Sequence, residues 1–225
     1  MSLIVKICGL STLEALDVAL EAGADMVGFV FFAPSPRHLE YDAARALGQR
    51  VRGRAQKVAL TVDADDATFA AIVESLRPDL LQLHGEERPQ RVAALRTRFG
   101  LPMMKAIAVE ASGDLAAIAA YAAVADRLLF DARAPREATR PGGLGKPFDW
   151  QLLENLDPGV PFMLSGGLTV DNVGEALGVT RAPGVDVSSG VERASGEKDP
   201  DKIRAFVRAA RAAAAVAAKP VTSPA

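Results

Sequence analysis

The sequence predicts a single-domain (β/α)8 barrel, the TIM-barrel fold of the α/β class, on three observations. Eight short apolar, β-rich runs alternate with eight amphipathic segments of helical period along the 225 residues. The strand–helix unit recurs with regular spacing, as a closed barrel requires. No Pro-, Gly- or Ser-rich linker divides the chain. An open, doubly wound sheet is the alternative, but it seldom contains eight regular units. We expect the barrel to span residues 1–219 and residues 220–225 to form a frayed tail.

The expected strands are short runs of β-branched and other apolar residues. Several of them are followed directly by glycine or by a polar residue, which marks the point where a strand gives way to a loop. In chain order they are Leu3–Cys8, Met26–Phe31, Lys57–Val62, Asp79–Leu83, Met103–Val109, Arg127–Asp131, Pro161–Ser165 and Val185–Ser188.

The expected helices are amphipathic and rich in Ala, Leu, Glu and Arg. Before the first helix, Ser11 and Glu14 have the form of a capping box. Gly23 is suited to end that helix, because glycine adopts the left-handed conformation at little cost. The later helices are expected at Asp42–Val51, Asp66–Leu76, Pro89–Phe99, Asp114–Val124, Phe148–Leu156, Thr169–Leu177 and Pro200–Ala218.

Composition narrows the class of protein. The chain has 49% hydrophobic residues, 24% charged residues and a net charge of −2, with no strongly basic stretch that would favour nucleic acid. One cysteine cannot form an internal disulfide, and neither a signal-peptide layout nor a membrane-spanning apolar run is apparent. We therefore expect a cytoplasmic protein that binds neither nucleic acid nor membrane. We expect a monomer, with a homodimer as the alternative.

Three residues at the predicted strand ends are suited to proton transfer. The active site of such a barrel lies at the carboxyl ends of its strands, where Cys8, His84 and Asp131 are expected. Each residue also has a structural interpretation. A lone cysteine is often a buried small hydrophobe, the histidine is as often a hydrogen-bonded structural residue, and the aspartate is suited to cap a loop or helix.

Glycines after the seventh and eighth strands predict an anion site. Gly166 and Gly167 follow one strand, and Ser189 and Gly190 follow the next. Backbone amides in such loops can approach a phosphate closely, and barrels frequently bind phosphate at this position. Either glycine pair alone is weak evidence, because turns require glycine in any case.

Two loops add candidate functions. Arg37 follows two prolines in the loop after the second strand, and its planar guanidinium suits a carboxylate, although a solvent-facing arginine is the alternative. The loop at 132–146 is long for a compact barrel and contains several glycines. Such loops are often lids over an active site, though some are merely disordered.

Alternation within the strands predicts a charged pair beneath the site. Side chains two residues apart share one face of a strand, so Lys6 lies below Cys8, and Asp186 lies below Ser188. The first and eighth strands are neighbours in a closed barrel. If this face is the barrel interior, Lys6 and Asp186 pair, because a buried charge needs a partner. An ammonium beside Cys8 would also lower the pKa of the thiol.

Taken together, these motifs resemble the phosphoribosylanthranilate isomerase family of tryptophan biosynthesis over essentially the whole chain. The matching segments are Lys6–Gly9, Gly28–Phe31 with Ser35–Arg37, Gln82–Gly85, Asp131 with Gly142–Gly143, Phe148–Trp150, Leu164–Leu168 and Asp186–Glu192. The clearest departure is Leu144, where the family usually has threonine. This departure bears on contacts of the threonine hydroxyl and leaves the two proton-transfer groups unaffected.

The resemblance implies an Amadori rearrangement of N-(5'-phosphoribosyl)anthranilate, an aminoaldose, to the corresponding aminoketose. It implies Asp131 as the general acid that opens the sugar ring and Cys8 as the general base that removes the proton from C2. Neither a cofactor nor a metal is implied, and the partner is a small phosphosugar substrate. The residues implied in binding are Arg37, His84 and Asp186 for the substrate, and Gly166, Gly167, Ser189 and Gly190 for its phosphate.

Rival functions differ in the residues they require. Indole-glycerol phosphate synthase would place a lysine and a glutamate at strand ends, which this chain does not match. An aminoaldose phosphate isomerase of histidine synthesis would place an aspartate in the first strand, where Cys8 stands. A non-catalytic phosphosugar-binding barrel would not need both Cys8 and Asp131. A turnover assay separates these alternatives.

Overall fold

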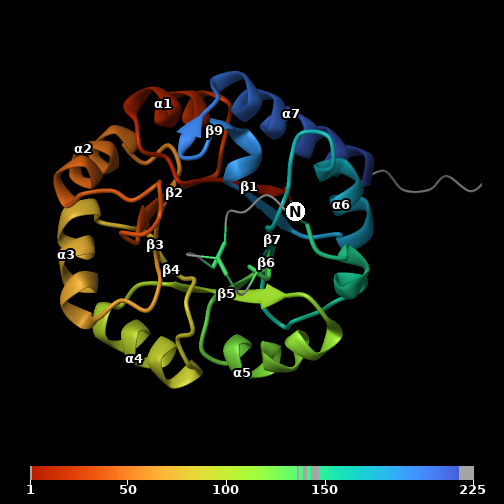
Figure 1. The fold of residues 1–225 in the computed structure, drawn as a ribbon, viewed down its shortest axis with the longest axis horizontal. Helices are drawn as coiled ribbons and strands as arrows, with labels where there is room; N and C mark the ends of the chain where they lie inside the picture. Colours follow the sequence, from red (N-terminus) through yellow and green to blue (C-terminus); the bar gives the residue numbers. More distant parts are fainter. Residues whose placement is uncertain (1, 136, 139–140, 143–146, 218–225) are drawn as a thin grey trace, which may run out of the picture.

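The closed barrel predicted from the sequence is confirmed. The computed structural model describes residues 2–135, 137–138, 141–142 and 147–217. Eight parallel strands pair in sequence order, β8 closes onto β1, and the helices form an outer ring (Figure 1). The strands are β1 (Ile4–Cys8), β2 (Met26–Phe31), β3 (Gln56–Thr61), β4 (Leu80–Leu83), β5 (Met103–Val109), β6 (Arg127–Ala132), β7 (Phe162–Leu164) and β8 (Gly184–Val187).

The outer ring contains α-helices and shorter 3-10 turns. The α-helices are α1 (Leu13–Glu21), α2 (Tyr41–Val51), α3 (Asp66–Leu76), α4 (Pro89–Phe99), α5 (Ile118–Ala122), α6 (Val173–Thr180) and α7 (Pro200–Ala217). The 3-10 turns are η1 (Ser112–Ala117), η2 (Trp150–Leu153) and η3 (Ser189–Val191). None of the helices within the described ranges is long and apolar enough to span a bilayer.

Two predicted helices are shorter than expected. The helix expected at Phe148–Leu156 is reduced to η2, because Asn155 adopts a left-handed backbone (φ 59°) that a helix cannot continue through. The helix expected at Asp114–Val124 divides into η1 and α5, and the Asp114 carboxylate accepts amide hydrogen bonds at the start of η1.

The cap of the first helix also differs from the expectation. The N-cap of α1 is Thr12, whose side chain accepts a hydrogen bond from the amide of Ala15 at 3.2 Å. The predicted capping box at Ser11 is therefore wrong by one residue. Gly23 has the expected left-handed backbone, with φ at 86°.

A short antiparallel hairpin follows β8 and was not predicted. It consists of β9 (Glu192–Ala194) and β10 (Glu197–Lys198), which pair with each other outside the barrel sheet. In Figure 1 the hairpin lies near the amino-terminal segment of the barrel, beside α1 and α7. Its two ends carry Glu192 and Lys198, which form an ion pair.

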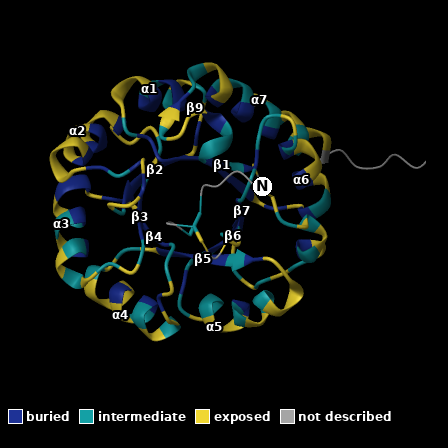
Figure 2. Cartoon of the chain, viewed as in Figure 1, coloured by how far each residue is buried: buried dark blue, intermediate teal, exposed yellow. Residues whose placement is uncertain are grey.

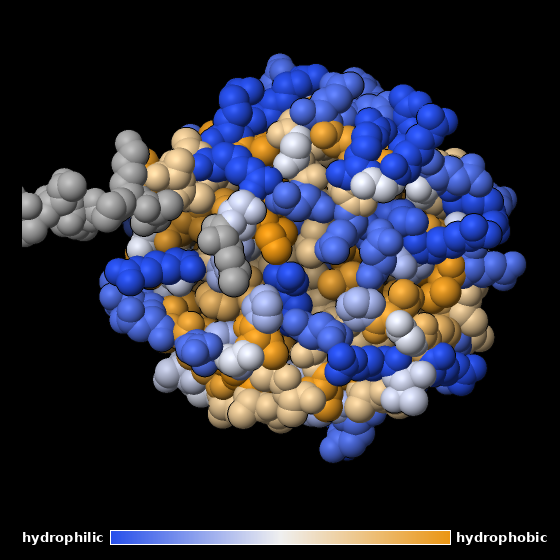
Figure 3. All heavy atoms as spheres, turned by 180° about the vertical axis from the view of Figure 1, so that it is seen from behind, coloured by the Kyte–Doolittle hydropathy of each residue, from blue (hydrophilic) through white to orange (hydrophobic). Residues whose placement is uncertain are grey.

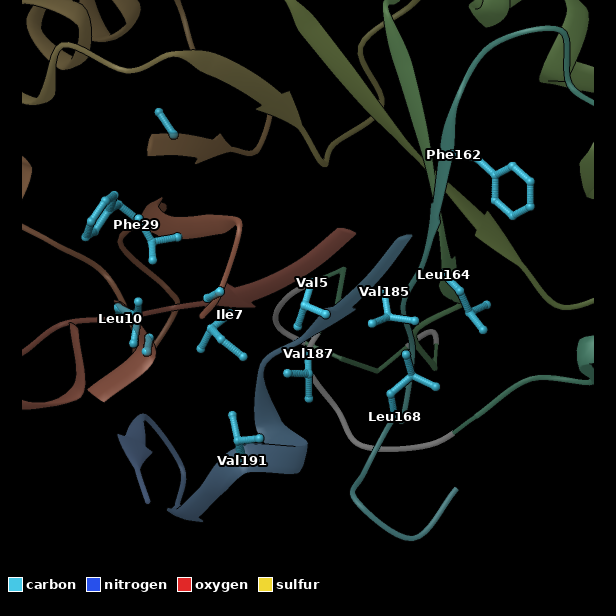
Figure 4. Packing of buried hydrophobic residues seen from close by; sticks show 14 of the residues in the cluster. Val5, Ile7, Leu10, Phe29, Phe162, Leu164, Leu168, Val185, Val187 and Val191 are labelled. Atoms are coloured by element: carbon cyan, nitrogen blue, oxygen red, sulfur yellow. The ribbon is translucent and has the colours of Figure 1, made fainter. Parts of the chain in front are cut away.

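The main apolar core lies between the strands and the helices. Val5 and Ile7 of β1 pack beside Val185 and Val187 of β8 in this layer (Figure 4). The barrel wall is buried, whereas the outward faces of the helices are exposed (Figure 2). Viewed from behind, the surface mixes hydrophilic and hydrophobic residues (Figure 3). The alternate side chains of each strand face the barrel interior, and these build the site.

Candidate active site

One pocket at the carboxyl ends of the strands contains every residue that the sequence singled out as a candidate. The loops after the strands form its walls, as expected for this fold. Its lining includes Cys8, Arg37, His84, Asp131, Gly166, Gly167, Asp186, Ser189 and Gly190. These residues come from strands on all sides of the barrel, so the closure of the sheet brings them together.

The predicted charged pair beneath the pocket is confirmed. Lys6 and Asp186 are direct neighbours in the register of β1 and β8, and the Lys6 ammonium lies 2.8 Å from Oδ1 of Asp186. The Lys6 side chain is fully buried. The Ser165 hydroxyl donates to the other oxygen, Oδ2, at 3.3 Å. Both oxygens of the buried carboxylate therefore have partners, as a charge in the interior requires.

Cys8 lies directly above this pair, and two opposing effects act on its thiol. The side chain is 3% exposed, and burial raises the pKa of the thiol. The Lys6 ammonium lowers it, as expected from the sequence, but the net direction is upward. Burial alone would lower the pKa of Lys6, yet Asp186 and Cys8 outweigh that effect and raise it. Lys6 is therefore charged, and it lowers the pKa of Cys8 as expected, but burial of the thiol outweighs this effect.

A glycine allows the thiol and the ammonium to approach each other. Gly28 of β2 is the register partner of Cys8. A β-carbon at this position would lie 2.9 Å from Sγ of Cys8 and 3.1 Å from Nζ of Lys6. Such distances are shorter than van der Waals contact, so any side chain at position 28 would displace one of the two groups. The glycine of the second strand is thus part of the site.

Asp131 takes part in a hydrogen-bonded chain that begins on β4. Nε2 of His84 lies 2.9 Å from Oδ2 of Asp131, and Nδ1 of His84 lies 3.0 Å from Nε2 of Gln82. The other carboxylate oxygen of Asp131 accepts from the amide of Ala132 at 3.0 Å. The sequence predicted His84 and Asp131 as separate candidates. Their direct contact, and the part of Gln82, were not predicted.

A second buried ion pair supports the loop that carries His84. The Lys105 ammonium of β5 lies 2.8 Å from Glu87 and donates to the carbonyl of Gly85 at 2.6 Å. Glu87 in turn accepts from the amides of Gly85 and Asp63. This pair ties the loop after β4 to the neighbouring strands, so His84 is attached to a rigid support.

Arg37 is held at the pocket wall by the hairpin after β8. Its Nε and Nη2 atoms donate to the two oxygens of Glu192 at 2.7 and 2.8 Å, a bidentate geometry. Lys198 joins Glu192 at 2.8 Å. Burial lowers the pKa of Lys198; burial alone would raise the pKa of Glu192, but the hydrogen bond from Arg37 and the charge of Lys198 lower it overall. Lys198 was not singled out from the sequence, because a lysine in a short polar segment resembles a surface residue.

An apolar cluster lies beside the thiol. Val30 and Leu60 pack with Cys8 in a small cluster, and Phe32 and Val62 pack against it. All four apolar residues line the pocket. The pocket therefore combines an apolar surface with a guanidinium, which suits a flat aromatic carboxylate.

The loops after β7 and β8 have the backbone geometry of an anion site. Gly166 and Gly167 adopt left-handed φ values of 85° and 66°. Within the described ranges, their amides donate to no protein acceptor. The following loop is fixed by Asn172, which accepts from the amide of Thr169 and donates to the carbonyl of Gly167. Rigid loops with amides available at a pocket suit a phosphate.

Other expectations concern the loop at 132–146 and metal binding. Part of that loop, including Gly143, Leu144 and Gly145, lies outside the described residues, as does the tail at 220–225. The neighbouring Pro141 and Gly142 line the pocket. A search of the described positions finds no cluster of three or more histidine, cysteine or acidic side chains suited to a metal ion.

Comparison with known proteins gives one consistent family. Residues 5–209 match the family model described as N-(5'-phosphoribosyl)anthranilate (PRA) isomerase. A relative of that name from Nitrobacter hamburgensis is 70% identical over 213 residues, covering 95% of each chain. Another from Bradyrhizobium is 69% identical and covers 95% of this chain and 97% of the relative.

Solved structures agree with this result. The phosphoribosyl anthranilate isomerase of Thermotoga maritima is 33% identical, with a TM-score of 0.84, and the match covers 93% of this chain and 99% of that one. A structure of a phosphoribosyl anthranilate isomerase in complex with reduced 1-(o-carboxyphenylamino)-1-deoxyribulose 5-phosphate is 31% identical, with a TM-score of 0.81. It covers 93% of this chain and 99% of that chain.

Proposed function

The chain belongs to the N-(5'-phosphoribosyl)anthranilate isomerase family, an enzyme family of tryptophan biosynthesis, and on this premise we propose that Cys8 and Asp131 perform the proton transfers of its reaction. The observation that carries the proposal is that a buried thiol from β1 and a carboxylate from β6 face one pocket. An intramolecular isomerisation needs one group that donates a proton and one that removes a proton. The pocket contains one of each.

The reaction moves a hydrogen from C2 to C1 of the sugar without net oxidation. Asp131 in its protonated form donates a proton to the ring oxygen, and the C1–O bond breaks as the nitrogen lone pair forms a C1=N bond, which gives an open-chain iminium ion. The Cys8 thiolate then removes the proton from C2, and the electron pair forms the C1=C2 bond of an enolamine. The Cys8 thiol returns a proton to C1, and the Asp131 carboxylate takes the proton of the C2 hydroxyl, which gives the ketone and restores both groups. Each positioned acid or base contributes roughly 10²–10⁴-fold to such a reaction.

Three regions of the pocket orient the substrate. The anthranilate carboxylate lies against Arg37, which Glu192 holds in place, and the aromatic ring lies along the apolar cluster beside Val30 and Leu60. The phosphate lies at the glycine loops after β7 and β8, at residues 166–167 and 189–190. His84 and Asp186 lie between these ends and contact the sugar. The relative solved with the reduced phosphosugar ligand supports this class of substrate.

The thiol must ionise for this mechanism, although burial raises its pKa. Lys6 is the charge that stabilises the thiolate when it forms, because the ammonium lies beside the sulfur and is itself held by Asp186. We therefore assign to Lys6 the stabilisation of the Cys8 thiolate during proton transfer. It does not keep the thiol permanently ionised.

The proposed assembly and location follow the same family assignment. We propose a cytoplasmic enzyme that acts as a monomer, with a homodimer as the alternative, since a relative from Thermotoga maritima is described as dimeric. The single catalytic domain comprises residues 1–219. The reaction draws its electrons from the substrate and takes no cofactor.

A turnover assay tests the function. The substrate is fluorescent, and its loss at micromolar enzyme concentration reports isomerisation. We expect turnover of N-(5'-phosphoribosyl)anthranilate by the wild-type chain, and a parallel assay with the aminoaldose of histidine synthesis shows whether it is a second substrate. Binding of the phosphosugar without turnover would instead indicate the non-catalytic barrel.

A further inference from the structure

The imidazole of His84 lies between two groups of different hydrogen-bonding capacity. On one side, Nε2 faces a carboxylate oxygen of Asp131 at 2.9 Å. On the other side, Nδ1 faces the side-chain amide of Gln82 at 3.0 Å. Gln82 is fully buried, and His84 follows it by two residues, so both side chains lie on the inner face of the barrel. The ring is thereby fixed at both nitrogens.

The amide of Gln82 can serve Nδ1 either as donor or as acceptor. A glutamine carries an N–H donor and an oxygen acceptor in nearly the same shape, and rotation by 180° exchanges them. With Nε2 of Gln82 toward the ring, Oε1 of Gln82 is buried and has no hydrogen-bond partner among the residues described. Neither orientation is therefore locked by a competing bond to that oxygen. The protonation of the ring decides between them.

The two orientations correspond to different numbers of protons on the His84–Asp131 pair. When the pair holds the extra proton, Nδ1 carries a hydrogen and needs an acceptor, which is Oε1 of Gln82. When the pair has released it, the one remaining ring hydrogen lies on Nε2 and faces the carboxylate. Nδ1 is then a bare acceptor and needs a donor, which is the amide N–H.

We propose that Gln82 is a positioning residue whose amide rotates to match the protonation state of His84 and Asp131. In this way the protonated and deprotonated forms of the pair have similar free energies. This inference rests on the proposed role of Asp131 as the acid. Only the proton moves: it passes from the pair to the ring oxygen of the sugar and is later regained. Glutamine is required because an apolar side chain offers Nδ1 neither a donor nor an acceptor, and a carboxylate offers only the acceptor that the protonated pair needs.

Other ionisable groups surround the pair from the neighbouring elements. They are unchanged in variants at position 82, so a comparison among these proteins isolates the amide. They are Cys8 of β1, Arg37 after β2, Asp63 after β3, Lys105 of β5, Arg133 after β6 and Asp186 of β8.

The test compares Gln82→Met, Gln82→Glu and the wild type. The pH profile of kcat should fall on its basic side as the acid loses its proton. In Gln82→Met, Nδ1–H has no acceptor, so this basic limb moves to lower pH by about one unit and kcat at neutral pH falls about tenfold. In Gln82→Glu, the carboxylate favours Nδ1–H, and the limb moves to higher pH. Two variants with opposite expected shifts distinguish the proposal from a general loss of packing.

Nitrogen-15 NMR of the imidazole gives a readout that does not depend on activity. The chain has two histidines, so the His84 signals are assigned as those that remain in His38→Asn. We expect the wild type to change from Nδ1–H to Nε2–H as pH rises, Gln82→Met to hold Nε2–H, and Gln82→Glu to hold Nδ1–H. The same ring form in all three proteins across the pH range would overturn the proposal.

Thr61→Val is the matched control. Thr61 is buried on the adjacent strand β3, and its hydroxyl has no partner within the described part of the chain. Its loss should leave the pH profile and the His84 spectrum as in the wild type, and a shift equal to that of Gln82→Met would count against a specific role for the amide. Wild-type turnover in Asp131→Asn would instead overturn the role of Asp131, a result that is read separately from the ring spectra.

Discussion

The two sides of the pocket hold their reactive groups in different ways. On the side of β1 and β8, Cys8 lies above a buried ion pair between Lys6 and Asp186. On the side of β4 and β6, Asp131 is hydrogen-bonded directly to His84. His84 is in turn hydrogen-bonded to Gln82, so this chain of side chains contains no lysine or arginine. The reactive group of one side thus lies against a buried ion pair, whereas that of the other side is hydrogen-bonded to an imidazole that can hold or release a proton.

This difference matches what each group must do. A thiol that becomes an anion in a buried site needs a permanent positive charge nearby, because desolvation opposes its ionisation. An acid that gives up a proton and regains it needs partners that accept both states. A fixed positive charge beside Asp131 would hold it ionised and remove it as a donor.

Loss of either reactive group is expected to have the largest effect on turnover. We expect Cys8→Ser and Asp131→Asn each to lower kcat by about 10²–10⁴-fold, because each removes one positioned proton-transfer group. Steady-state assays of substrate fluorescence measure this. The two variants should retain the circular dichroism spectrum of the wild type. Near-normal turnover in one of them would show that this side of the pocket does not react.

Lys6→Met tests whether the charged side depends on its cation. The variant leaves Asp186 buried and unpaired, so we expect a loss of about 3–5 kcal/mol in the free energy of unfolding. It also removes the group that lowers the pKa of Cys8, so the acidic limb of the pH profile should move to higher pH. Denaturant unfolding and pH–rate profiles measure these effects.

Lys105→Met is the matched control for that prediction. It breaks the other buried ion pair, with Glu87, which is of similar burial and length. The loss of stability should be comparable. The acidic limb should stay in place, because Lys105 is not among the groups that shift the pKa of Cys8. Equal movement of the limb in both variants would argue for a general effect of destabilisation.

The sequence predicts the side of β1 and β8 better than the side of β4 and β6. Alternation in β1 and β8 places Lys6 and Asp186 on one inner face, and barrel closure makes these strands neighbours, so their pairing follows from pattern alone. The sign of the net pKa shift of Cys8 does not follow, because it depends on the depth of burial. Sequence reveals the nearby charge but not the desolvation that outweighs it.

The features that were missed share a physical cause. Lys198 lies in a hairpin too short and too polar to show strand alternation, so its burial was not apparent. The contact between His84 and Asp131 joins β4 to β6, strands that are not adjacent, across the interior of the barrel. Pattern analysis of single strands gives neighbours in the sheet, whereas contacts across the interior depend on side-chain length and direction.

Gly28→Ala tests how closely the charged side is packed. The new β-carbon would press on Sγ of Cys8 and Nζ of Lys6, so we expect a loss of about 1–3 kcal/mol in stability and a lower kcat. Gly178→Ala is the control, since Gly178 lies within α6 and a β-carbon there meets nothing within 4 Å. It should stabilise the protein by about 0.5–1 kcal/mol and leave kcat unchanged. Equal kcat in both variants would show that the contact between thiol and ammonium is not needed.

The smallest expected effect is the pH dependence of stability that the thiol causes. Because burial raises the pKa of Cys8, the folded protein retains the thiol proton where the unfolded chain has lost it. Stability falls with rising pH wherever the folded state binds more protons than the unfolded chain. This contribution to the free energy of unfolding is therefore intact below about pH 8.5 and is lost as pH rises above it. The slope is at most about 1.4 kcal/mol per pH unit. Lys198, whose pKa is lowered, acts in the opposite direction, and because its pKa also depends on Cys8, the difference between wild type and Cys8→Ser reports the thiol together with its coupling to Lys198. Urea unfolding of both proteins from pH 7 to 10 measures it, and a constant difference over that range would mean that the thiol ionises as easily in the barrel as in water.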